Sequence, residues 1–524
     1  MNMTWMGKPT VTKPASTWEK CGNLCFQDQE RCKVGWTWTE EAFYKGSCSL
    51  YSNSKLMPNQ EGAISGTPFC PGNLKRKFEQ LNFCFFIVED CDHHHFTTWW
   101  DVVSPCFKKR VENQPIDNPE LCIPEPNPTM KTKIDDSIQA LNTTVYDSEE
   151  LLALVDKMYE NVPTDYVEFC PGDFDAMITY LKVVVMIPPP FLIDAANYIG
   201  VPITTVVLCF LHTQEGRKFF ANPKVNEKMR TLVNVYAEVL NSSDSLSVFN
   251  NGQYGWTSTC AKRLVNYEEF HGSFKSFNDF FTRDIKDVKT TRPLDNSDYV
   301  LTAPGDVALS YHAMNVDFNN SLYMKNEKYS LLQIFNNEPS VAQPFVGGAI
   351  LQVYFSASKY HCYHAPISGQ IIYAEKVPGI IYAIDEVNAA KNNDLTGGKS
   401  VSSQEKLDLW LELGQNGIID TEFYLAHVAT RCVFVIDSPI LGKVGMVFIG
   451  MTEISSCTMI KAKGENVEKG EKLGNFQFGG SSGVIAIQKE AVDESKMGEN
   501  GDNIWRDITG KWLMGQKLVD LTPL

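Results

Sequence analysis

The segment Phe476-Gln-Phe-Gly479-Gly480-Ser481-Ser482-Gly483-Val484-Ile-Ala-Ile487 joins a run of glycine and serine to an apolar, β-branched run. The second part, 484–487, is typical of a buried β-strand. Similar short runs, punctuated by Gly, Pro and Asn, occur elsewhere after residue 300: 349–355, 370–374, 432–436 and 447–449. We therefore predict an α+β chain whose C-terminal part is a mainly antiparallel β core.

Residues 479–483 also match G-x-S-x-G, the turn that exposes the nucleophile of α/β-hydrolases. That turn requires a helix after the serine and a histidine later in the chain. Here a β-branched run follows Ser481, and the last histidine of the chain is His427. The hydrolase interpretation therefore fails, and the segment is either a flexible loop or a serine used in another reaction.

A helical region is expected before the β core. The stretch 147–159 begins with Asp147, which we expect to be the N-cap, and its apolar residues share one helical face: Leu151, Leu152, Val155, Met158 and Tyr159. Asn222-Pro223 indicates the start of another helix, which should end near Leu240 and bury Val225, Met229, Leu232, Val233 and Tyr236.

Residues 195–214 contain no Asp, Glu, Lys or Arg and are long enough to span a bilayer. However, Asn197, Pro202 and Thr204 are poorly suited to hydrocarbon. We therefore expect a buried core helix here, and a transmembrane helix is the alternative.

The composition excludes a disordered chain, a collagen and a multi-span membrane protein. The chain has 524 residues, of which 43% are hydrophobic and 21% charged, values that fit a globular protein of about three domains. With 63 acidic and 47 basic residues, the net charge is -16. Because phosphate binding needs a basic face, nucleic acid is not expected as a partner.

The N-terminal quarter is rich in cysteine, with nine of the 15 cysteines between Cys21 and Cys122. Residues 15–75 resemble a PAN/apple-type module, a small disulfide-held domain that would bind protein or carbohydrate; an unrelated Cys-rich fold is the alternative. Residues 76–133 form a Cys-containing linker region. In it, His93-His94-His95 is expected to be a solvated loop, because three adjacent side chains cannot easily face one metal ion.

The cellular compartment stays open at this point. Disulfides require an oxidising compartment, and sequons at Asn142, Asn241 and Asn319 fit secretion, although a long chain carries some by chance. The first residues do not have the apolar run of a signal peptide. Either the start of the gene is incomplete or wrong, or the module has free thiols in the cytosol.

Two further segments contain candidate catalytic or metal-binding residues. In Tyr360-His361-Cys-Tyr-His364-Ala-Pro366, two histidines three residues apart suit an acid–base pair or two metal ligands, but further metal ligands are not obvious nearby. Asp306 follows Pro304-Gly305, where an aspartate is ordinarily a turn residue. Each segment alone also fits a structural role.

Together and in this order, the segments resemble the phosphatidylserine decarboxylase family. The resemblance rests on four motifs: Phe277-Asn-Asp-Phe-Phe281-Thr-Arg283 with Arg292-Pro293, Pro304–Asp306, Tyr360–Pro366 and Gly479–Ser482. It covers about residues 265–490. The preceding helical stretch resembles the extra N-terminal domain of a fungal-type branch, which includes decarboxylases of free amino acids such as tryptophan. We accordingly expect a helical domain over 134–260 and a catalytic core over 265–524.

The resemblance implies a proenzyme that cleaves itself between Gly480 and Ser481. His364, oriented by Asp306, would take the proton of Ser481, whose oxygen would attack the Gly480 carbonyl. β-Elimination and hydrolysis would leave a pyruvoyl group at position 481 on an α chain, 481–524, held with its β chain, 1–480.

The pyruvoyl ketone would form a Schiff base with an amino-bearing carboxylate substrate and take up the electrons released with CO2. His361 is the implied proton donor to the α-carbon. Neither a metal nor pyridoxal phosphate is then required.

The sequence departs from the family pattern at several positions in or near these motifs: Val307, Lys359, Ser482 and the segment that contains Glu453. Glu453 and Ser482 are candidate substrate-pocket residues, although Glu453 also fits a satisfied strand carboxylate. Two substrates stay in balance: phosphatidylserine, giving phosphatidylethanolamine, and a free aromatic L-amino acid such as tryptophan. The alternative function is a secreted binding protein in which the Cys-rich module acts and the decarboxylase-like part is inactive.

Overall fold

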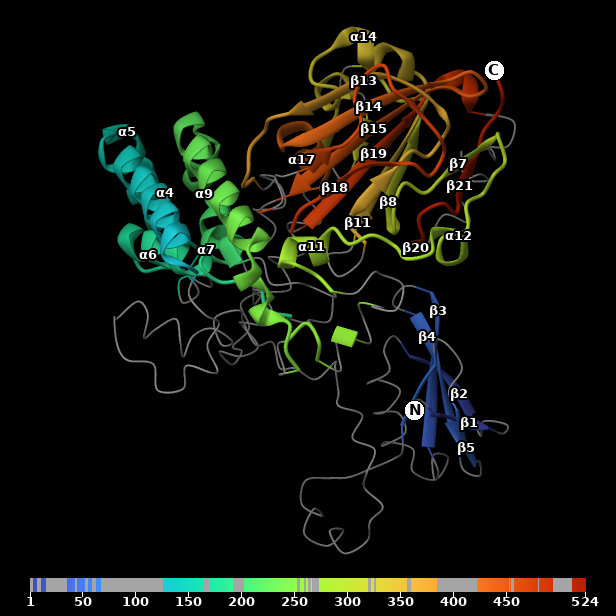
Figure 1. Cartoon of the computed structure of the whole chain (residues 1–524), viewed down its shortest axis with the longest axis horizontal. Helices are drawn as coiled ribbons and strands as arrows, with labels where there is room; N and C mark the ends of the chain where they lie inside the picture. Colours follow the sequence, from blue (N-terminus) through green and yellow to red (C-terminus); the bar gives the residue numbers. More distant parts are fainter. Residues whose placement is uncertain are drawn as a thin grey trace, which may run out of the picture. The chain divides into compact units, whose positions relative to one another are not determined.

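The computed structural model divides the chain into two compact units, Met1–Val88 and Glu89–Leu524 (Figure 1). In the first unit it describes the backbone of six strands only. In the second it describes residues 126–524, apart from 164–166, 168–169, 192–201, 252–254, 259–260, 263–264, 266–272, 319–321, 325–326, 356–359, 384–421, 452, 454–456, 479 and 493–510.

The described part of the first unit is antiparallel β structure. One sheet has the order β2 (Val11–Ala15), β4 (Lys45–Tyr51), β3 (Gly35–Ala42), β6 (Ala63–Gly66), and a separate pair joins β1 (Met3–Met6) to β5 (Lys55–Pro58). The disulfides expected in the PAN/apple-like module and the triplet His93–His95 lie outside the described side chains. That module therefore stays a prediction.

The second unit begins with six α-helices, teal to green in Figure 1: α4 (Pro128–Tyr146), α5 (Glu149–Glu160), α6 (Phe174–Val184), α7 (Pro202–Leu211), α8 (Gln214–Ala221) and α9 (Pro223–Asn241). Helix α9 begins after the Asn222 cap and buries the five apolar residues that its periodicity predicts. Ser148 rather than Asp147 caps α5, accepting from Leu151 N–H. The expected cap was wrong by one residue because Asp147 ends α4 instead.

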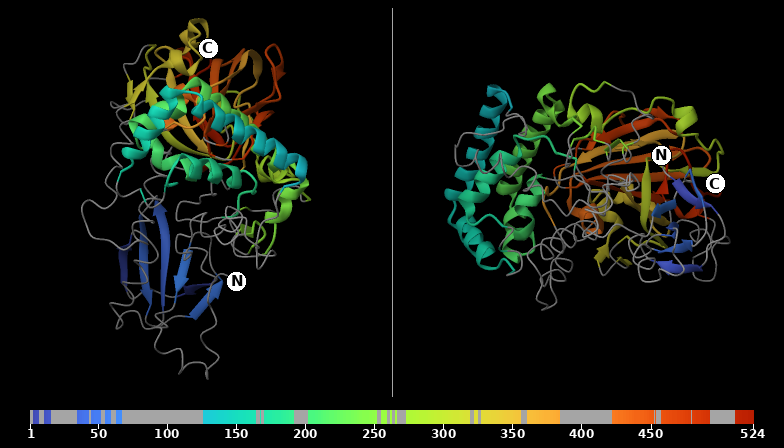
Figure 2. Two further views of the ribbon diagram at one scale, coloured as in Figure 1. Left: turned by 90° about the vertical axis from the view of Figure 1, so that its left-hand side faces the viewer. Right: turned by 90° about the horizontal axis from the view of Figure 1, so that it is seen from below.

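The charge-free stretch contains α7, a helix with nearly all of its residues buried. Among the described residues, no helix combines the length and apolar composition needed to cross a bilayer. The two views in Figure 2 show α4–α9 gathered beside the β core. A disulfide between Cys170 and Cys209 ties α7 to the segment before α6.

The β core is an eight-stranded antiparallel sheet, which confirms the predicted fold class. Its order is β17 (Asn466–Val467), β13 (Gly369–Val377), β14 (Arg431–Ser438), β15 (Gly442–Met451), β19 (Gly480–Ile487), β11 (Ala349–Phe355), β8 (Val307–Met314) and β20 (Lys511–Trp512). Strand β11 has the predicted bounds. Strand β19 lies between β15 and β11, and burial of residues 484–487 explains their continuous apolar sequence.

Smaller elements complete the unit. A three-stranded sheet has the order β12 (Cys362–His364), β18 (Lys472–Phe476), β16 (Cys457–Met459), and β7 (Val300–Thr302) pairs with β21 (Lys517–Asp520). A disulfide between Cys432 and Cys457 joins β14 to β16. The remaining elements are β9 (Leu322–Met324), β10 (Glu327–Tyr329), α11 (Phe277–Phe281), α12 (Val288–Thr291), α13 (Leu331–Ile334), α14 (Pro339–Ala342), α17 (Glu422–Val428) and three short 3-10 helices (Ser243–Val248, Gln343–Phe345, Lys489–Ala491).

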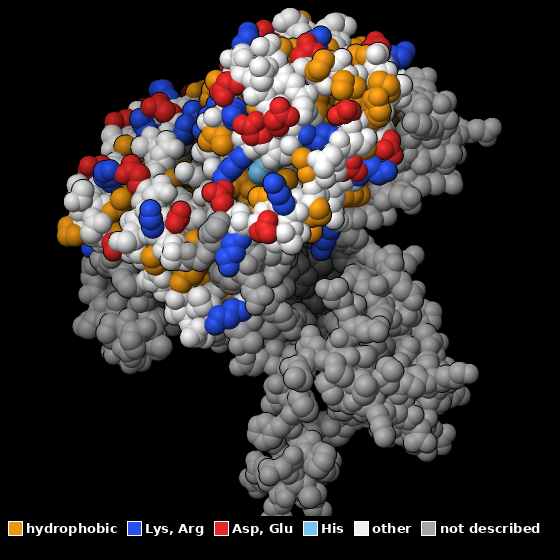
Figure 3. All heavy atoms as spheres, turned by 45° about the vertical axis from the view of Figure 1, so that its right-hand side comes forward, with side chains coloured by type: hydrophobic (Ala, Val, Ile, Leu, Met, Phe, Trp, Pro, Cys, Tyr) orange, Lys and Arg blue, Asp and Glu red, His pale blue; other side chains and the backbone are white. Residues whose placement is uncertain are grey.

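Charged side chains of both signs are intermixed on the face seen in Figure 3, with hydrophobic side chains between them. Within the described residues of this face, basic side chains do not gather into one broad surface.

Candidate active site

Ser481 lies at the start of the central strand β19. In the sheet it faces Gly450 of β15 and Phe355 of β11. Its side chain is fully buried, and its Oγ makes no hydrogen bond among the described residues. A buried hydroxyl left without a partner costs about 1–3 kcal/mol, so this serine is held where it does not serve stability.

Phe355 connects Ser481 to the aspartate motif. On its other side Phe355 faces Val307 of β8, the residue after Asp306. Two strand spacings, about 10 Å, therefore separate the backbones of Ser481 and Val307. A Cβ on Gly305 would lie 2.5 Å from the Phe355 ring, so only glycine allows this approach.

Asp306 is held by a buried arginine. Its Oδ1 accepts from Arg292 Nε at 2.9 Å, and its Oδ2 accepts from Arg292 Nη2 at 2.7 Å. The backbone N–H of Met514 donates to Oδ1 at 3.0 Å. Both charged side chains are almost fully buried, so this bidentate pair compensates each charge and fixes the carboxylate.

His364, in β12, has a defined tautomer. Its Nδ1 lies 2.9 Å from the carbonyl oxygen of Gly470, which can only accept, so Nδ1 carries the proton. Its Nε2 therefore accepts from the Tyr360 hydroxyl at 2.8 Å. Burial lowers the pKa of His364 to about 4. At neutral pH the imidazole is uncharged, with its basic lone pair on Nε2.

His364 and Asp306 meet through the backbone rather than through a direct hydrogen bond. The His364 N–H donates to Pro304 O at 2.8 Å. Among the described residues, the carboxylate of Asp306 binds Arg292 and Met514, and the imidazole binds Gly470 and Tyr360. The charge of Asp306 still opposes the effect of burial on the pKa of His364.

His361 is fully buried and stacks on Phe281 of α11, with ring centroids 4.1 Å apart. Phe281 in turn contacts the ring of Phe478 at 5.5 Å. The backbone carbonyl of His361 accepts from Phe476 N–H at 2.9 Å. This histidine therefore packs against the segment that leads into the Gly480–Ser481 bond.

The two pocket candidates have different surroundings. Ser482 Oγ accepts from Gln352 Nε2 at 3.0 Å within the sheet. Glu453 follows β15 and is only 4% exposed. Its Oε1 accepts from Thr204 N–H and its Oε2 from the Thr204 hydroxyl, each at 2.7 Å. The carboxylate therefore caps the first turn of α7 from the β core.

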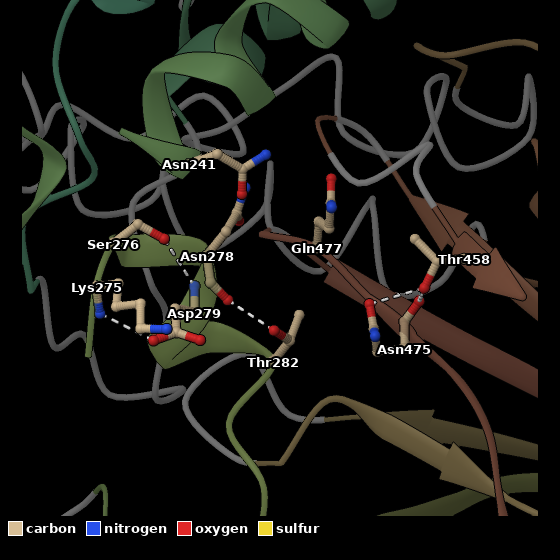
Figure 4. A pocket seen from close by; sticks show the side chains of 9 residues that line it. All are labelled: Asn241, Lys275, Ser276, Asn278, Asp279, Thr282, Thr458, Asn475 and Gln477. Carbon is tan, nitrogen blue, oxygen red and sulfur yellow. Dashed lines mark hydrogen bonds between the residues drawn. The ribbon is translucent and has the colours of Figure 1, made fainter. Parts of the chain in front are cut away.

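A polar pocket of about 350 Å³ lies between α11 and β18. Figure 4 shows its lining of amide, hydroxyl and charged side chains, among them Asn278, Asp279, Thr458 and Gln477. The side chain of Asn278 accepts from Phe478 N–H at 3.2 Å, so one wall of the pocket anchors the segment before the expected cleavage bond.

Sequence reasoning did not single out several of these residues as site residues. Arg292 and Tyr360 lay in the quoted motifs, where an arginine directly before Pro293 and a tyrosine four residues before His364 were usable signals. No signal in the sequence pointed to Gly470, Asn278 or Thr204 as site residues. Gly479 and Lys359 lie outside the described residues. Among the described residues, no group of three or more His, Cys, Asp or Glu side chains could hold a metal ion.

Comparison with known proteins gives two family matches. A model described as phosphatidylserine decarboxylase matches residues 277–520, and a second with the same description matches residues 135–265. The first covers the β core with the motif residues, and the second covers the helical region. Together the matches span both parts of the larger structural unit.

Similar curated proteins carry two kinds of name. L-tryptophan decarboxylase of Psilocybe cyanescens is 29% identical over 56% of this chain and 69% of its own length. Decarboxylase iboD of Amanita muscaria is 28% identical over 56% of this chain and 85% of its own length. Phosphatidylserine decarboxylase proenzyme of Clostridium perfringens is 28% identical over 42% of this chain and 63% of its own length.

Proposed function

We propose, from the premise that this chain belongs to the phosphatidylserine decarboxylase family and is a carboxy-lyase, that it cleaves itself between Gly480 and Ser481 and works with a pyruvoyl group formed from Ser481. The observation that carries this proposal is the buried Ser481 hydroxyl, which makes no hydrogen bond among the described residues and directly follows two glycines. A pyruvoyl group fits this position because it needs the oxygen of Ser481 only during its formation.

In the proposed cleavage, His364 Nε2 takes the proton of Ser481 after the Tyr360 hydroxyl moves aside or passes the proton on. Ser481 Oγ attacks the Gly480 carbonyl carbon, and the amide becomes an ester. Elimination frees the Gly480 carboxylate, and hydrolysis releases the former serine nitrogen as ammonia. The nearby negative charge of Asp306 favours the imidazolium that forms in the first step.

In the decarboxylation, the pyruvoyl group supplies a ketone for the substrate amine and an acceptor for the electrons released with CO2. We assign His361 the return of a proton to the substrate α-carbon. Its burial, and its stacking on Phe281 beside Phe478, support this role because water is excluded from that side.

We propose a free aromatic L-amino acid such as tryptophan as the substrate. The matches to L-tryptophan decarboxylase and to Decarboxylase iboD extend over 56% of this chain, whereas the match to the Clostridium perfringens proenzyme extends over 42%. Phosphatidylserine stays the second candidate because both family matches carry its name.

Denaturing gels and intact mass test the cleavage. Purified chain should give residues 1–480 and a 44-residue fragment, 481–524, whose first residue is a pyruvoyl group. Ser481→Ala should give one uncut chain. An uncut wild-type chain with an ordinary serine at position 481 would overturn the proposal and favour an inactive scaffold beside a binding module.

Release of CO2 from L-tryptophan and from phosphatidylserine vesicles then separates the two substrates. We expect turnover of the free amino acid, with activity lost in Ser481→Ala. Turnover of the vesicles alone would assign the lipid as substrate.

A further inference from the structure

A buried carboxylate lies close to the expected cleavage bond. Met451 of β15 faces Gly480 in the ladder with β19, and Glu453 follows Met451 by two residues. Two residues of chain reach at most about 7 Å. Glu453 is therefore a neighbour of the residues that flank the start of the α chain, although the proposed cleavage makes no use of it.

Glu453 accepts two hydrogen bonds from neutral donors of α7. The N–H of Thr204 donates to its Oε1 and the Thr204 hydroxyl donates to its Oε2, each at 2.7 Å. Both donors belong to the first turn of α7, where helix geometry favours a negative group. The helical region thereby holds an acidic side chain of the β core in one orientation.

Two buried tyrosines lie close enough to this carboxylate to be affected by its charge. Burial raises the pKa of Tyr236 and of Tyr382 well above 10, and the charge of Glu453 raises both further, so both stay protonated. The Tyr236 hydroxyl donates to Ile187 O at 3.1 Å. The Tyr382 hydroxyl, on a side chain only 1% exposed, makes no hydrogen bond among the described residues. Such a hydroxyl can donate or accept a hydrogen bond, and leaving it buried is costly unless a ligand or water meets it.

An aromatic wall joins this region to His361. The ring of His361 stacks on Phe281, and Phe281 contacts Phe478. Phe478 contacts Tyr236 at 6.4 Å, edge to face. Phe478 precedes Gly480 by two residues, so this row of rings reaches the segment that leads into the expected cleavage bond. One end of the wall is therefore His361, the assigned proton donor, and the other end is Tyr236, which is affected by the charge of Glu453.

We propose that Glu453 and Tyr382 form the side-chain end of the substrate pocket and select a free amino acid whose aromatic side chain carries an N–H donor. The aromatic wall packs against the ring of the substrate, and the carboxylate of Glu453 and the hydroxyl oxygen of Tyr382 are the acceptors for its N–H. This inference rests on the proposed decarboxylase function. An anionic phosphodiester beside Glu453 is repelled, so the same residues disfavour phosphatidylserine.

The test compares L-tryptophan with 1-methyl-L-tryptophan, which keeps the ring and lacks the N–H. Because a hydrogen bond to a charged group contributes about 1.5–3 kcal/mol, wild type should prefer tryptophan by about 10- to 150-fold in kcat/KM. Glu453→Gln should reduce that preference to a few-fold. Tyr382→Phe removes a hydroxyl that holds nothing else among the described residues, and it should raise KM for tryptophan with little effect on the melting temperature.

Glu150→Gln is the matched control, since Glu150 is exposed on α5. All variants should be cleaved as wild type on denaturing gels. If wild type is cleaved and active while Glu453→Gln and Tyr382→Phe keep its preference and KM, or if wild type turns over only phosphatidylserine vesicles, the inference is overturned. If wild type is uncut or releases no CO2 from any of these substrates, the proposed function itself fails.

Discussion

Two buried carboxylates flank the candidate active site, and the protein stabilises them differently. Asp306 is bound by the guanidinium of Arg292, a charge of opposite sign. Glu453 is bound by the neutral N–H and hydroxyl of Thr204. A bidentate ion pair supplies an opposite charge and fixes geometry, whereas the two neutral donors orient a carboxylate without supplying an opposite charge. We call Asp306 with Arg292 and the neighbouring His364 the Asp306 corner, and Glu453 with Thr204 the Glu453 corner. The difference suggests that the Asp306 corner maintains the cleavage machinery and that the Glu453 corner recognises a ligand.

The largest effect is expected from Arg292→Met, which leaves Asp306 buried without its cation. Removing one partner of a buried ion pair costs about 3–5 kcal/mol. Thermal or urea unfolding of the β core, measured in a Ser481→Ala background so that all chains are uncut, should show this loss. With Ser481 intact, cleavage should be slow on gels.

A double variant, Arg292→Met with Asp306→Asn, separates charge from packing. Because replacing both partners of a buried pair is often nearly neutral, most of the stability should return. Cleavage should stay slow, since the charge that favours the imidazolium of His364 is gone. Full recovery of cleavage would show that Asp306 has a structural role only.

These two corners also show what sequence reasoning could reach. Helix α9 and strand β11 were predicted well because their apolar residues follow one period over many positions. Asp306 and His364 were found through motifs, but the bonds that orient them come from Arg292, Gly470 and Tyr360. Loop geometry, not composition, decides those partners.

Other features had no signal in the sequence. The three strands β12, β18 and β16 are too short for an alternation pattern. Thr204 and Glu453 are 249 positions apart, and one is in a helix whereas the other follows a strand. Only the packing of the helical region on the β core brings them together.

Acid should lower the free energy of unfolding of the protein, because His364 in the Asp306 corner is buried in its neutral form. The unfolded imidazole binds a proton below about pH 6.5, whereas burial keeps the folded one neutral until about pH 4. Protons therefore favour the unfolded chain between these values. The stability contribution is complete above pH 6.5, and about 3 kcal/mol of it is lost as the pH falls to 4.

Urea midpoints of Ser481→Ala measured from pH 8 to pH 4 check this, with the added substitution His364→Gln as the comparison. The difference between the two proteins should shrink or reverse toward pH 4. An unchanged difference would mean that His364 is not buried neutral. Cleavage by wild type should keep a nearly constant rate down to about pH 5, because Nε2 stays unprotonated.

The smallest effect is expected at the Glu453 corner from Thr204→Val, which keeps the N–H and removes the hydroxyl that donates to Oε2. Losing one hydrogen bond to a buried carboxylate costs about 1–3 kcal/mol, below the cost expected at Arg292. Cleavage should be normal, because Asp306 and His364 keep their partners. Thr204→Ser, the matched control, keeps the hydroxyl and should unfold at nearly the wild-type midpoint. If Thr204→Val lowered the free energy of unfolding as much as Arg292→Met, the contrast between the corners would be wrong. Neutral donors would then be as essential to Glu453 as a cation is to Asp306.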